Sequence, residues 1–424
     1  MKIKTLKTHE KLAIHGGPKT ISSPFPGRGL IGRQEKAAVN ALFDEAIRTG
    51  NAFGYNGPSE ERYACEFAKF MGGGYADGVN SGTTAVYVAL RALDIDPFTE
   101  VIVSSITDPG GMMPVAMLNC VPIPADTIPG GYNTGPEEIE KLISPLTSAI
   151  VVAHIGGEPA DIEGIVKVAK RHRIPVVEDC SQSHGAELNG RKVGAFGDVA
   201  AFSTMFGKHH CTGGQGGVVF TRNEKLYQRV RQASDRGKPF GLPAGSTNTM
   251  ASLNFNLSDL AAAIGIVQLK KLPSIVRRRR GFVARLARGL RGLRSVSLPL
   301  ELPGAKSSYW FLRMRFHPEQ MNCDKETFCK ALAAEGVSLN PCYRAAMPHL
   351  MDWYKNRRVF GRSGAPWMSP LYKGDPQRRF PCPNAMASTA EQFNLTLSES
   401  WDAKQAAAIL RAIEKVEAAF GREK

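Results

Sequence analysis

Long apolar runs are missing from this sequence of 424 residues. No stretch of about 18 uncharged apolar residues occurs, so we expect no membrane-spanning helix. The first residues, MKIKTLKTHEKLAIHGG, lack the apolar core of a secretory signal peptide. We therefore expect a soluble, cytoplasmic protein.

Cysteine is also sparse, with eight residues at irregular spacing. This spacing argues against a disulfide framework and against a zinc-binding pattern. The adjacent His209, His210 and Cys211 make a poor metal site, because neighbouring side chains point in different directions. We predict no metal ion. Hydrophobic residues make up 43% and charged residues 22%, a balance that supplies a core, and the length favours two domains.

Acidic residues are in deficit, with 39 against 54 basic ones and a net charge of +15. The densest basic cluster is Arg277 to Arg280, which we interpret as a solvated helix face. No helix-turn-helix, zinc-finger or RNA-binding signature accompanies it. We therefore expect no nucleic-acid partner and interpret the charge as favouring phosphorylated ligands.

Short, β-branched apolar runs alternate with amphipathic segments along the first part of the chain. Such runs are typical of strands buried on both faces of a sheet. The alternation predicts an α/β fold with a large, mainly parallel sheet and helices on both sides. The predicted strands lie at 101–104, 149–155, 175–180, 199–203 and 217–221, and the predicted helices include 59–71, 135–143 and 160–173.

A long helix is predicted from Ser258 to Leu272, ending before Pro273. We place a domain boundary near residue 275, which leaves a large α/β domain with an N-terminal arm (1–275) and a smaller C-terminal α+β domain (276–424). In the second domain we expect a strand at 309–316, helices at 325–335 and 400–420, and a loop rich in glycine, proline and arginine at 356–379.

Three groups of residues stand where an α/β sheet binds its ligands, beyond the carboxyl ends of the strands. Asp179 ends an apolar run, Lys208 follows Ser203 by five positions, and Gly82-Thr83 begins a helix. Each alone is explained as a turn, a surface charge or a helix cap. Together, a carboxylate for a pyridinium nitrogen, an amine nucleophile and a helix N-terminus for a phosphate are the parts of a pyridoxal phosphate site.

The sequence around these residues resembles the sugar aminotransferases of the DegT/DnrJ/EryC1/StrS family, within the fold type I pyridoxal phosphate enzymes. The motifs that carry the resemblance are NSGTTA (80–85), AHIGGEPADI (153–162), VVEDCSQSHGA (176–186) and LNFNLSDLAAAIGIVQLKKL (253–272). The resemblance implies transfer of an amino group from glutamate or glutamine to a keto sugar, nucleotide-linked or phosphorylated.

The resemblance also implies a role for each matching residue. Lys208 would form a Schiff base with pyridoxal 5'-phosphate and move the proton during transfer. Asp179 would face the ring nitrogen, and Gln182 the phenolic oxygen. Asn254 would reach the phosphate of a neighbouring subunit, which implies a homodimer with shared active sites. The phosphate would further contact Gly82, Thr83, Thr84 and Ser203, and the candidates for substrate contact are His154, His184 and His349.

Three positions depart from the family pattern. Asp108 and Pro109 stand where the family places an aromatic residue that stacks on the cofactor, Gln215 replaces a glutamate, and Asn256 replaces an arginine. A carboxylate cannot supply the dispersion contact of a ring. These changes bear on the identity of the substrate.

Two other functions stay open. Some relatives carry histidine in place of the lysine and act as sugar dehydratases, and counting back from Gln215 selects His209. We favour Lys208, because the chemistry needs a primary amine. A DNA-binding regulator that kept the fold is the third interpretation, and it would require a broken cofactor site.

Overall fold

The computed structural model describes residues 10–422 and is centred on a seven-stranded sheet. Its strand order is β1-β9-β8-β5-β4-β2-β3, in which β9 runs antiparallel to both neighbours and every other pair is parallel. The predicted α/β class with a mainly parallel sheet is therefore confirmed. The strands are β1 (Tyr75–Val79), β2 (Glu100–Ser104), β3 (Val121–Ala125), β4 (Thr147–Ala153), β5 (Val176–Asp179), β8 (Val199–Ser203) and β9 (Gly217–Thr221).

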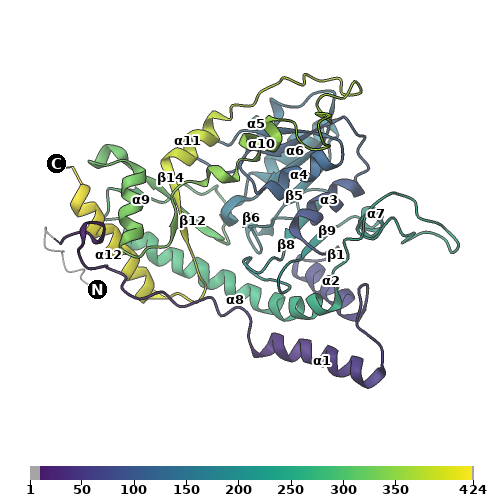
Figure 1. Ribbon diagram of the computed structural model, residues 1–424, viewed down its shortest axis with the longest axis horizontal. Helices are drawn as coiled ribbons and strands as arrows, with labels where there is room; N and C mark the ends of the chain where they lie inside the picture. The colour runs from purple at the N-terminus through teal and green to yellow at the C-terminus, as the bar shows by residue number, and fades with distance from the viewer. Residues whose placement is uncertain (1–9, 423–424) are drawn as a thin grey trace.

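Helices surround this sheet and also lie in the C-terminal part of the molecule (Figure 1). They are α1 (Arg33–Thr49), α2 (Pro58–Phe70), α3 (Gly82–Ala92), α4 (Pro109–Met117), α5 (Pro136–Glu140), α6 (Ile162–His172), α7 (Glu224–Ser234), α8 (Asp259–Leu290), α9 (Lys325–Ala334), α10 (Asp352–Lys355), α11 (Pro383–Glu391) and α12 (Ala403–Phe420). Among the described residues, none of the helices is long and apolar enough to cross a membrane.

Strand β8 shows that the sheet is covered on both faces. Val199 and Ala201 belong to a core shared with α3 and α6, whereas Ala200 and Phe202 belong to a core shared with α2 and α8. Successive side chains of a strand point to opposite faces, so an apolar run without alternation fills both cores. This is why the apolar runs identified the inner strands.

Two smaller sheets complete the fold, and one of them forms the body of the C-terminal part. That sheet has the order β10-β12-β14-β13 with antiparallel pairs, and its core includes residues of α9 and α12. The third sheet has the order β11-β6-β7. The strands are β6 (Glu187–Leu188), β7 (Arg191–Lys192), β10 (Val296–Ser297), β11 (Ala305–Lys306), β12 (Phe311–Phe316), β13 (Leu339–Asn340) and β14 (Gln392–Thr396). As predicted, 356–379 forms neither helix nor strand.

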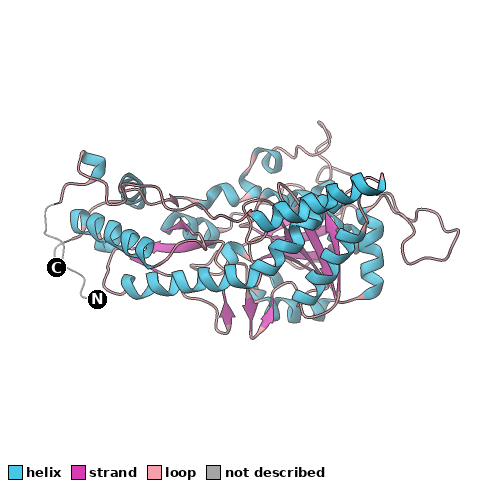
Figure 2. Cartoon of the chain, turned by 90° about the horizontal axis from the view of Figure 1, so that it is seen from below, coloured by secondary structure: helices cyan, strands magenta, loops and turns pink. Residues whose placement is uncertain are grey.

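Helix α8 joins the two parts and corrects the prediction that it ends before Pro273. It continues through Pro273 to Leu290 and runs from the large sheet toward the end of the molecule where both termini lie (Figures 1 and 2). A proline inside a helix costs about 3 kcal/mol. Burial of one large apolar side chain returns about 1.5–3 kcal/mol, and α8 buries such residues on both sides of the proline, among them Leu272 and Phe282. Packing therefore outweighs the missing hydrogen bond.

The predicted boundary near residue 275 falls inside α8. Up to Val276, buried α8 residues belong to the core of the large sheet, and from Phe282 they belong to the C-terminal core. We propose to divide the domains between these two residues. Leu12 and Ile21 of the N-terminal arm lie in the C-terminal core, so the arm extends across the division.

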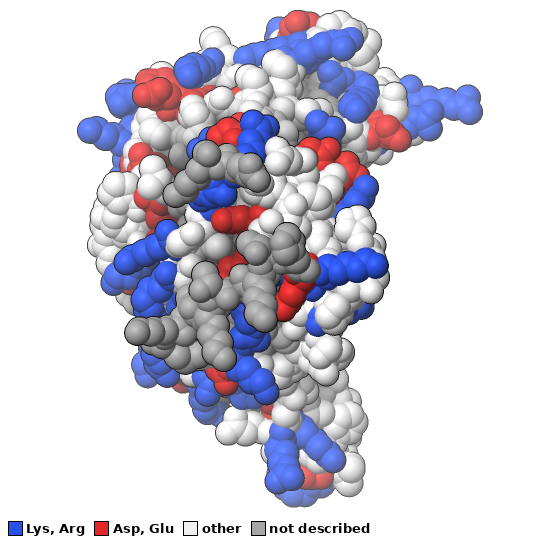
Figure 3. All heavy atoms as spheres, turned by 90° about the vertical axis from the view of Figure 1, so that its left-hand side faces the viewer, with Lys and Arg blue, Asp and Glu red and all other residues white. Residues whose placement is uncertain are grey.

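The arginine cluster of α8 also differs from the prediction of a solvated face. Arg277 and Arg278 are exposed, but Arg279 is only 2% exposed and Arg280 is half-buried. The 3.6-residue period places Arg279 on the same side as buried Leu272 and Val276. On the face seen in Figure 3, lysine and arginine are scattered among neutral and acidic side chains.

Candidate active site

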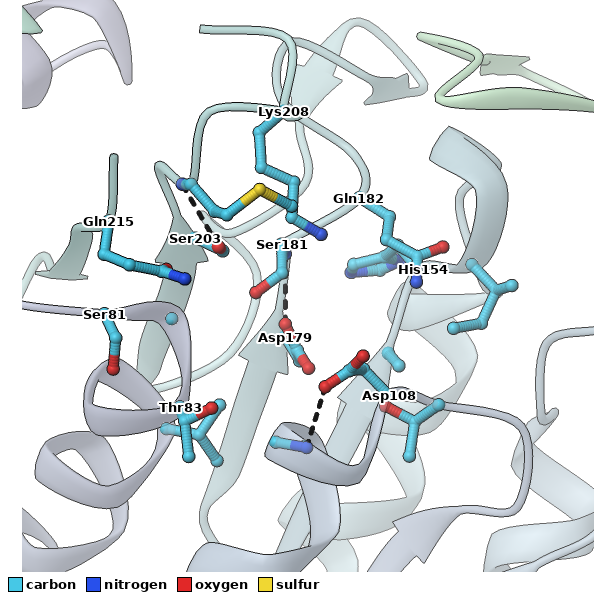
Figure 4. A pocket seen from close by; sticks show the side chains of 18 residues that line it. Ser81, Thr83, Asp108, His154, Asp179, Ser181, Gln182, Ser203, Lys208 and Gln215 are labelled. Atoms are coloured by element: carbon cyan, nitrogen blue, oxygen red, sulfur yellow. Dashed lines mark hydrogen bonds between the residues drawn. The ribbon is translucent and has the colours of Figure 1, made fainter. Parts of the chain in front are cut away.

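A cavity of about 270 Å³ opens at the carboxyl ends of the parallel strands. It is lined by the residues that follow β1, β2, β4, β5 and β8, which is where an α/β sheet places a ligand. Lys208, Asp179 and Asp108 are the lining side chains of lysine, aspartate or glutamate type. In Figure 4, Lys208 and Asp179 extend into the same space from different elements. Two residues predicted to act together are thus neighbours in one cavity.

The N-terminus of α3 forms one wall. Ser81 caps the helix and accepts a hydrogen bond from the Thr84 N–H. The N–H groups of Gly82 and Thr83, in the first turn, have no carbonyl four residues earlier within the helix. A Cβ atom on Gly82 would lie 2.4 Å from the Cβ of Ser203, so only glycine allows this close approach. Unpaired N–H groups at a helix N-terminus suit a phosphate.

Lys208 is the buried amine of the cavity, with 7% of its surface exposed. Burial lowers its pKa, opposed by the negative charges of Asp179 and Asp108. Its Nζ lies 4.1 Å from the centre of the Trp310 ring, whose Nε1 donates to the Gly207 carbonyl. A lysine with a lowered pKa has a larger neutral fraction near neutral pH and is a better nucleophile.

Asp179 ends β5 and is 7% exposed. Burial raises its pKa, while hydrogen bonding to Ser181 and the charge of Lys208 lower it. One carboxylate oxygen accepts from the Ser181 N–H at 3.0 Å. A Cβ atom on Gly111 would lie 2.9 Å from the other oxygen, which shows how closely α4 approaches. The site therefore holds a carboxylate whose charge lacks full compensation and would gain from a cationic partner.

A hydrogen-bonded clamp holds the backbone around Lys208, and the sequence did not indicate it. Arg28 of the N-terminal arm donates to the carbonyls of Gly207, Lys208 and His209, and its Nε lies 2.9 Å from Glu399. Arg279 of α8 holds the same glutamate at 2.8 Å. The arm, α8 and the C-terminal part thus meet at this loop. The only signal in the sequence was the run Arg277 to Arg280 in an amphipathic helix, which could have indicated that one arginine pairs with a buried acid such as Glu399.

Gln182 lines the cavity and is held in place by both ends of its amide. Its Oε1 accepts from the Gly156 N–H at 2.8 Å, and its Nε2 donates to the Tyr343 hydroxyl at 3.1 Å. Tyr343 stacks on Tyr132 with ring centres 5.7 Å apart. The second N–H of the amide stays available for a ligand. Tyr343 was not predicted, because it is distant in sequence.

The three predicted substrate histidines have different places. His154 lines the cavity, but its Nδ1 accepts from the Ala160 N–H and its Nε2 lies 3.1 Å from Glu178, so both nitrogens are engaged. His184 does not line the cavity; it is 1% exposed and bonded to His210 at 2.8 Å. His349 lines a separate cavity.

Two predicted phosphate contacts also lie outside the cavity lining. Thr84 uses its hydroxyl to donate to Asn80. Asn254 is exposed, and its side-chain oxygen accepts from Asn256 at 2.7 Å. The lining instead includes Gln215, which departs from the family pattern, together with Ser203 and Thr83.

His209, the alternative to Lys208, faces away from the cavity. It is fully buried, and its Nε2 lies 3.1 Å from the Ser308 carbonyl. His210 contacts Tyr63 and His184 instead, and Cys211 lies near Gln268. The three adjacent side chains thus point to different surroundings.

Asp108 caps α4 and occupies the predicted position of the stacking ring. One of its oxygens accepts from the Gly110 N–H at 2.9 Å, and the side chain reaches the cavity (Figure 4). Within the described part of the chain, the cavity lining contains no aromatic side chain other than His154. Two rings lie close by: Trp310 lies against the Lys208 amine, and Tyr343 accepts a hydrogen bond from Gln182.

Comparison with known proteins identifies the same family along most of the chain. The model of the DegT/DnrJ/EryC1/StrS aminotransferase family matches residues 33–414. The dTDP-3-amino-3,4,6-trideoxy-alpha-D-glucose transaminase of Streptomyces venezuelae is 33% identical over 301 residues, covering 69% of this chain and 77% of that protein. The L-glutamine:2-deoxy-scyllo-inosose aminotransferase of Streptomyces fradiae is 33% identical over 349 residues, covering 78% of this chain and 81% of that protein.

Solved structures agree in fold. A crystal structure of S. venezuelae DesV matches with a TM-score of 0.75 and 28% identity, covering 90% of this chain and 93% of that one. The aminotransferase from Psychrobacter cryohalolentis matches with a TM-score of 0.81 and 24% identity, covering 93% and 99%. These matches extend the shared architecture to both parts of the molecule.

Proposed function

We propose, from the premise that this chain belongs to the DegT/DnrJ/EryC1/StrS aminotransferase family, that it moves an amino group from glutamate or glutamine to a keto sugar with pyridoxal 5'-phosphate. The observation that carries the proposal is the presence of Lys208 and Asp179, both buried, in the lining of the same cavity. A primary amine opposite a buried carboxylate is the donor set that this cofactor needs.

The residues present fit the cofactor. Lys208 would hold it covalently, and Asp179 would hold its ring nitrogen. Gln182 has an N–H left for the phenolic oxygen. The free N–H groups of Gly82 and Thr83 would bind the phosphate. When bound, the cofactor supplies the electron sink for the transfer.

The chain's own groups then handle the protons. The lowered pKa of Lys208 leaves its amine ready to take a proton from the donor's α-carbon and to return one to the acceptor. Asp179, whose pKa burial raises, is stabilised as an anion when it faces a protonated nitrogen. The negative charge of the Asp179 carboxylate would keep that proton on the ring nitrogen. A neutral amide or an apolar group at position 179 could not do so.

We extend the proposal to the acceptor and the assembly. Two relatives at 33% identity are named for a dTDP-linked amino sugar and for a keto cyclitol, so a ketone on a hydroxylated ring is the shared chemistry. A nucleotide-linked or phosphorylated keto sugar suits the net charge of +15. In a homodimer, the exposed Asn254 would reach the phosphate of the neighbouring site. A dehydratase using His209 is disfavoured, since His209 faces Ser308.

The test is Lys208→Ala in protein reconstituted with pyridoxal 5'-phosphate. We expect the visible absorption band of the lysine-bound cofactor to vanish, together with amine transfer from glutamate or glutamine. Lys404→Ala, at an exposed position of α12, is the matched control and should keep both. Full turnover by the Lys208 variant would refute the proposal.

A further inference from the structure

A second cavity, of about 570 Å³, lies between His349 and the loop that joins α10 to α11. This loop runs along the top of the molecule in Figure 1. The volume falls within the range of small-molecule sites. It is separate from the Lys208 cavity, with which it shares none of its lining residues.

The charged groups that line this cavity are all cationic. They are Lys355, Arg357, Arg378 and Arg379, and no carboxylate lines the cavity in the described part of the chain. Within residues 10–422, none of the four lies within 4 Å of an acidic oxygen. Asp375, close in sequence, accepts from the Gln377 N–H instead. Four cations with no ion-pair partner within 4 Å among the described residues create a positive potential that favours an anionic ligand.

The wall is rigid as well as basic. Arg357 donates to the Tyr354 and Pro376 carbonyls at 3.2 and 3.0 Å. Its guanidinium also lies over the rings of Tyr354 and Trp367, 5.0 and 4.6 Å from their centres. Tyr354 in turn donates to the Pro122 carbonyl of β3 at 3.0 Å. A cation held by aromatic faces and backbone loses little entropy on binding a ligand.

His349 supplies an independent indication of a ligand. It lines the cavity and is 4% exposed, yet neither ring nitrogen has a hydrogen-bond partner among the described residues. The Ser105 backbone and the Asp126 carboxylate lie near enough to favour the protonated ring. The Ser105 contact falls short of hydrogen-bond geometry, and Asp126 accepts from Asn384 and Ala385. A buried donor without a partner is costly unless a ligand satisfies it.

We propose that this cavity binds the phosphate or diphosphate group of a ligand. Guanidinium groups and an imidazole N–H match phosphate oxygens in geometry and charge. The ring of Phe380, with Arg378 over it at 5.0 Å, offers a flat surface beside the cations. The segment after β2 lies beside both cavities, because the Ser105 backbone is close to His349 and Thr107 lines the Lys208 cavity.

The test is calorimetric titration of the cofactor-loaded protein with inorganic pyrophosphate. We expect saturable binding with one site per chain, weakened by added salt. The double variant Arg378→Gln, Arg379→Gln should bind at least about tenfold more weakly, equivalent to about 1.4 kcal/mol. Arg362→Gln, an exposed position of the same loop outside the lining, is the matched control and should bind as the unchanged protein does. His349→Phe should also weaken binding while keeping a ring of similar size.

Absence of pyrophosphate binding, or equal affinity of the double variant and the Arg362 control, overturns the proposal. Two further arms identify the source of the phosphate. If a nucleoside diphosphate competes and binds more tightly than pyrophosphate, the ligand is a nucleotide. If the two bind equally, only the phosphate group is recognised. These measurements need no turnover, so their outcome is distinguishable from that of the Lys208→Ala test.

Discussion

The two cavities that border the segment after β2 differ in the sign and the burial of their charges. The first holds Lys208 and Asp179, each 7% exposed, and burial shifts the pKa of both toward the neutral form. The second holds four cations, of which Lys355 and Arg379 are exposed. Buried groups with shifted pKa values are suited to moving protons, whereas a cluster of cations attracts an anion. The comparison separates a site for reaction from a site for binding.

The largest effect on the first cavity is expected for Asp179→Asn. We expect the rate at which glutamate or glutamine changes the absorption of the cofactor-loaded protein to fall by about 10²–10⁴-fold. The physical reason is that an amide cannot stabilise a proton on the cofactor's ring nitrogen. Stopped-flow absorption after mixing with the donor measures the effect.

The control for that experiment is pyrophosphate binding, which the same variant should retain. A variant that loses pyrophosphate binding as well would show that the two cavities are not independent. A loss of less than tenfold in the reaction with donor would contradict the role given to Asp179.

The second expectation concerns the clamp on the Lys208 loop. Arg28→Met removes one ion pair and the donor to three carbonyls. Hydrogen bonds from a charged group contribute about 1.5–3 kcal/mol, and Arg279 keeps Glu399 paired. We therefore expect a loss of about 1–3 kcal/mol in the free energy of unfolding, measured by urea denaturation, and a weaker hold on the cofactor.

Arg48→Met is the matched control for the clamp. Arg48 pairs with Glu45 on α1, where both side chains are more than half exposed. Exposed pairs contribute about 0–1 kcal/mol, so this variant should unfold close to the unchanged protein. Equal losses in the two variants would contradict a special role for Arg28.

The third expectation is a pH dependence that His349 adds. Burial lowers its pKa to about 4, opposed by Asp126 and the Ser105 backbone and aided by Lys355. Between pH 6.5 and 4 the unfolded chain therefore binds a proton that the folded chain refuses. This difference removes stability as the pH falls.

His349→Phe should accordingly lose less stability on acidification than the unchanged protein, by at most about 3 kcal/mol at pH 4. Thermal unfolding at a series of pH values tests this. Other buried histidines contribute in both proteins, so the difference between the two curves is the quantity of interest. Pyrophosphate should reduce the acid loss only in the protein that carries His349.

Apolar runs identified the inner strands of the sheet but neither edge. Strand β3, with the sequence VPIPA, carries two prolines, which are tolerated because an edge strand has one unpaired side. Strand β1 contains Asp77 and Gly78, both poor strand formers. The strand preferences of individual residues therefore do not predict the two edge strands, whose structure depends on one neighbouring strand and on tertiary packing.

The residues of the active site were likewise predicted only in part. Motifs named Lys208, Asp179, Gln182 and the start of α3, which all line the cavity. They missed Arg28 and Tyr343, whose contacts join positions more than 150 residues apart. Such contacts follow from the way distant segments of the chain pack together, which no short motif encodes. They also named His349 as a candidate for substrate contact, which stays a prediction, and the structure places this residue in the lining of the second cavity.

The smallest effect is expected for Asp108→Asn, which tests how much the exposed carboxylate contributes beside the buried one. Asparagine keeps an oxygen for the Gly110 N–H, so α4 should remain capped. Asp108 raises the pKa of Lys208 less than Asp179 does. Its removal should therefore lower that pKa slightly and slow the reaction with donor by less than about tenfold, or about 1.4 kcal/mol.

The pH profile of covalent labelling of Lys208 in cofactor-free protein separates these two carboxylates. Asp108→Asn should shift the midpoint to lower pH, and Asp179→Asn should shift it further in the same direction. A shift to higher pH would contradict the effect of Asp108 on the pKa of Lys208. A rate loss in Asp108→Asn as large as that of Asp179→Asn would mean that the exposed carboxylate takes part in the reaction itself. The acid at the position of the missing ring would then be a catalytic group, and the first cavity would depend on two carboxylates instead of one.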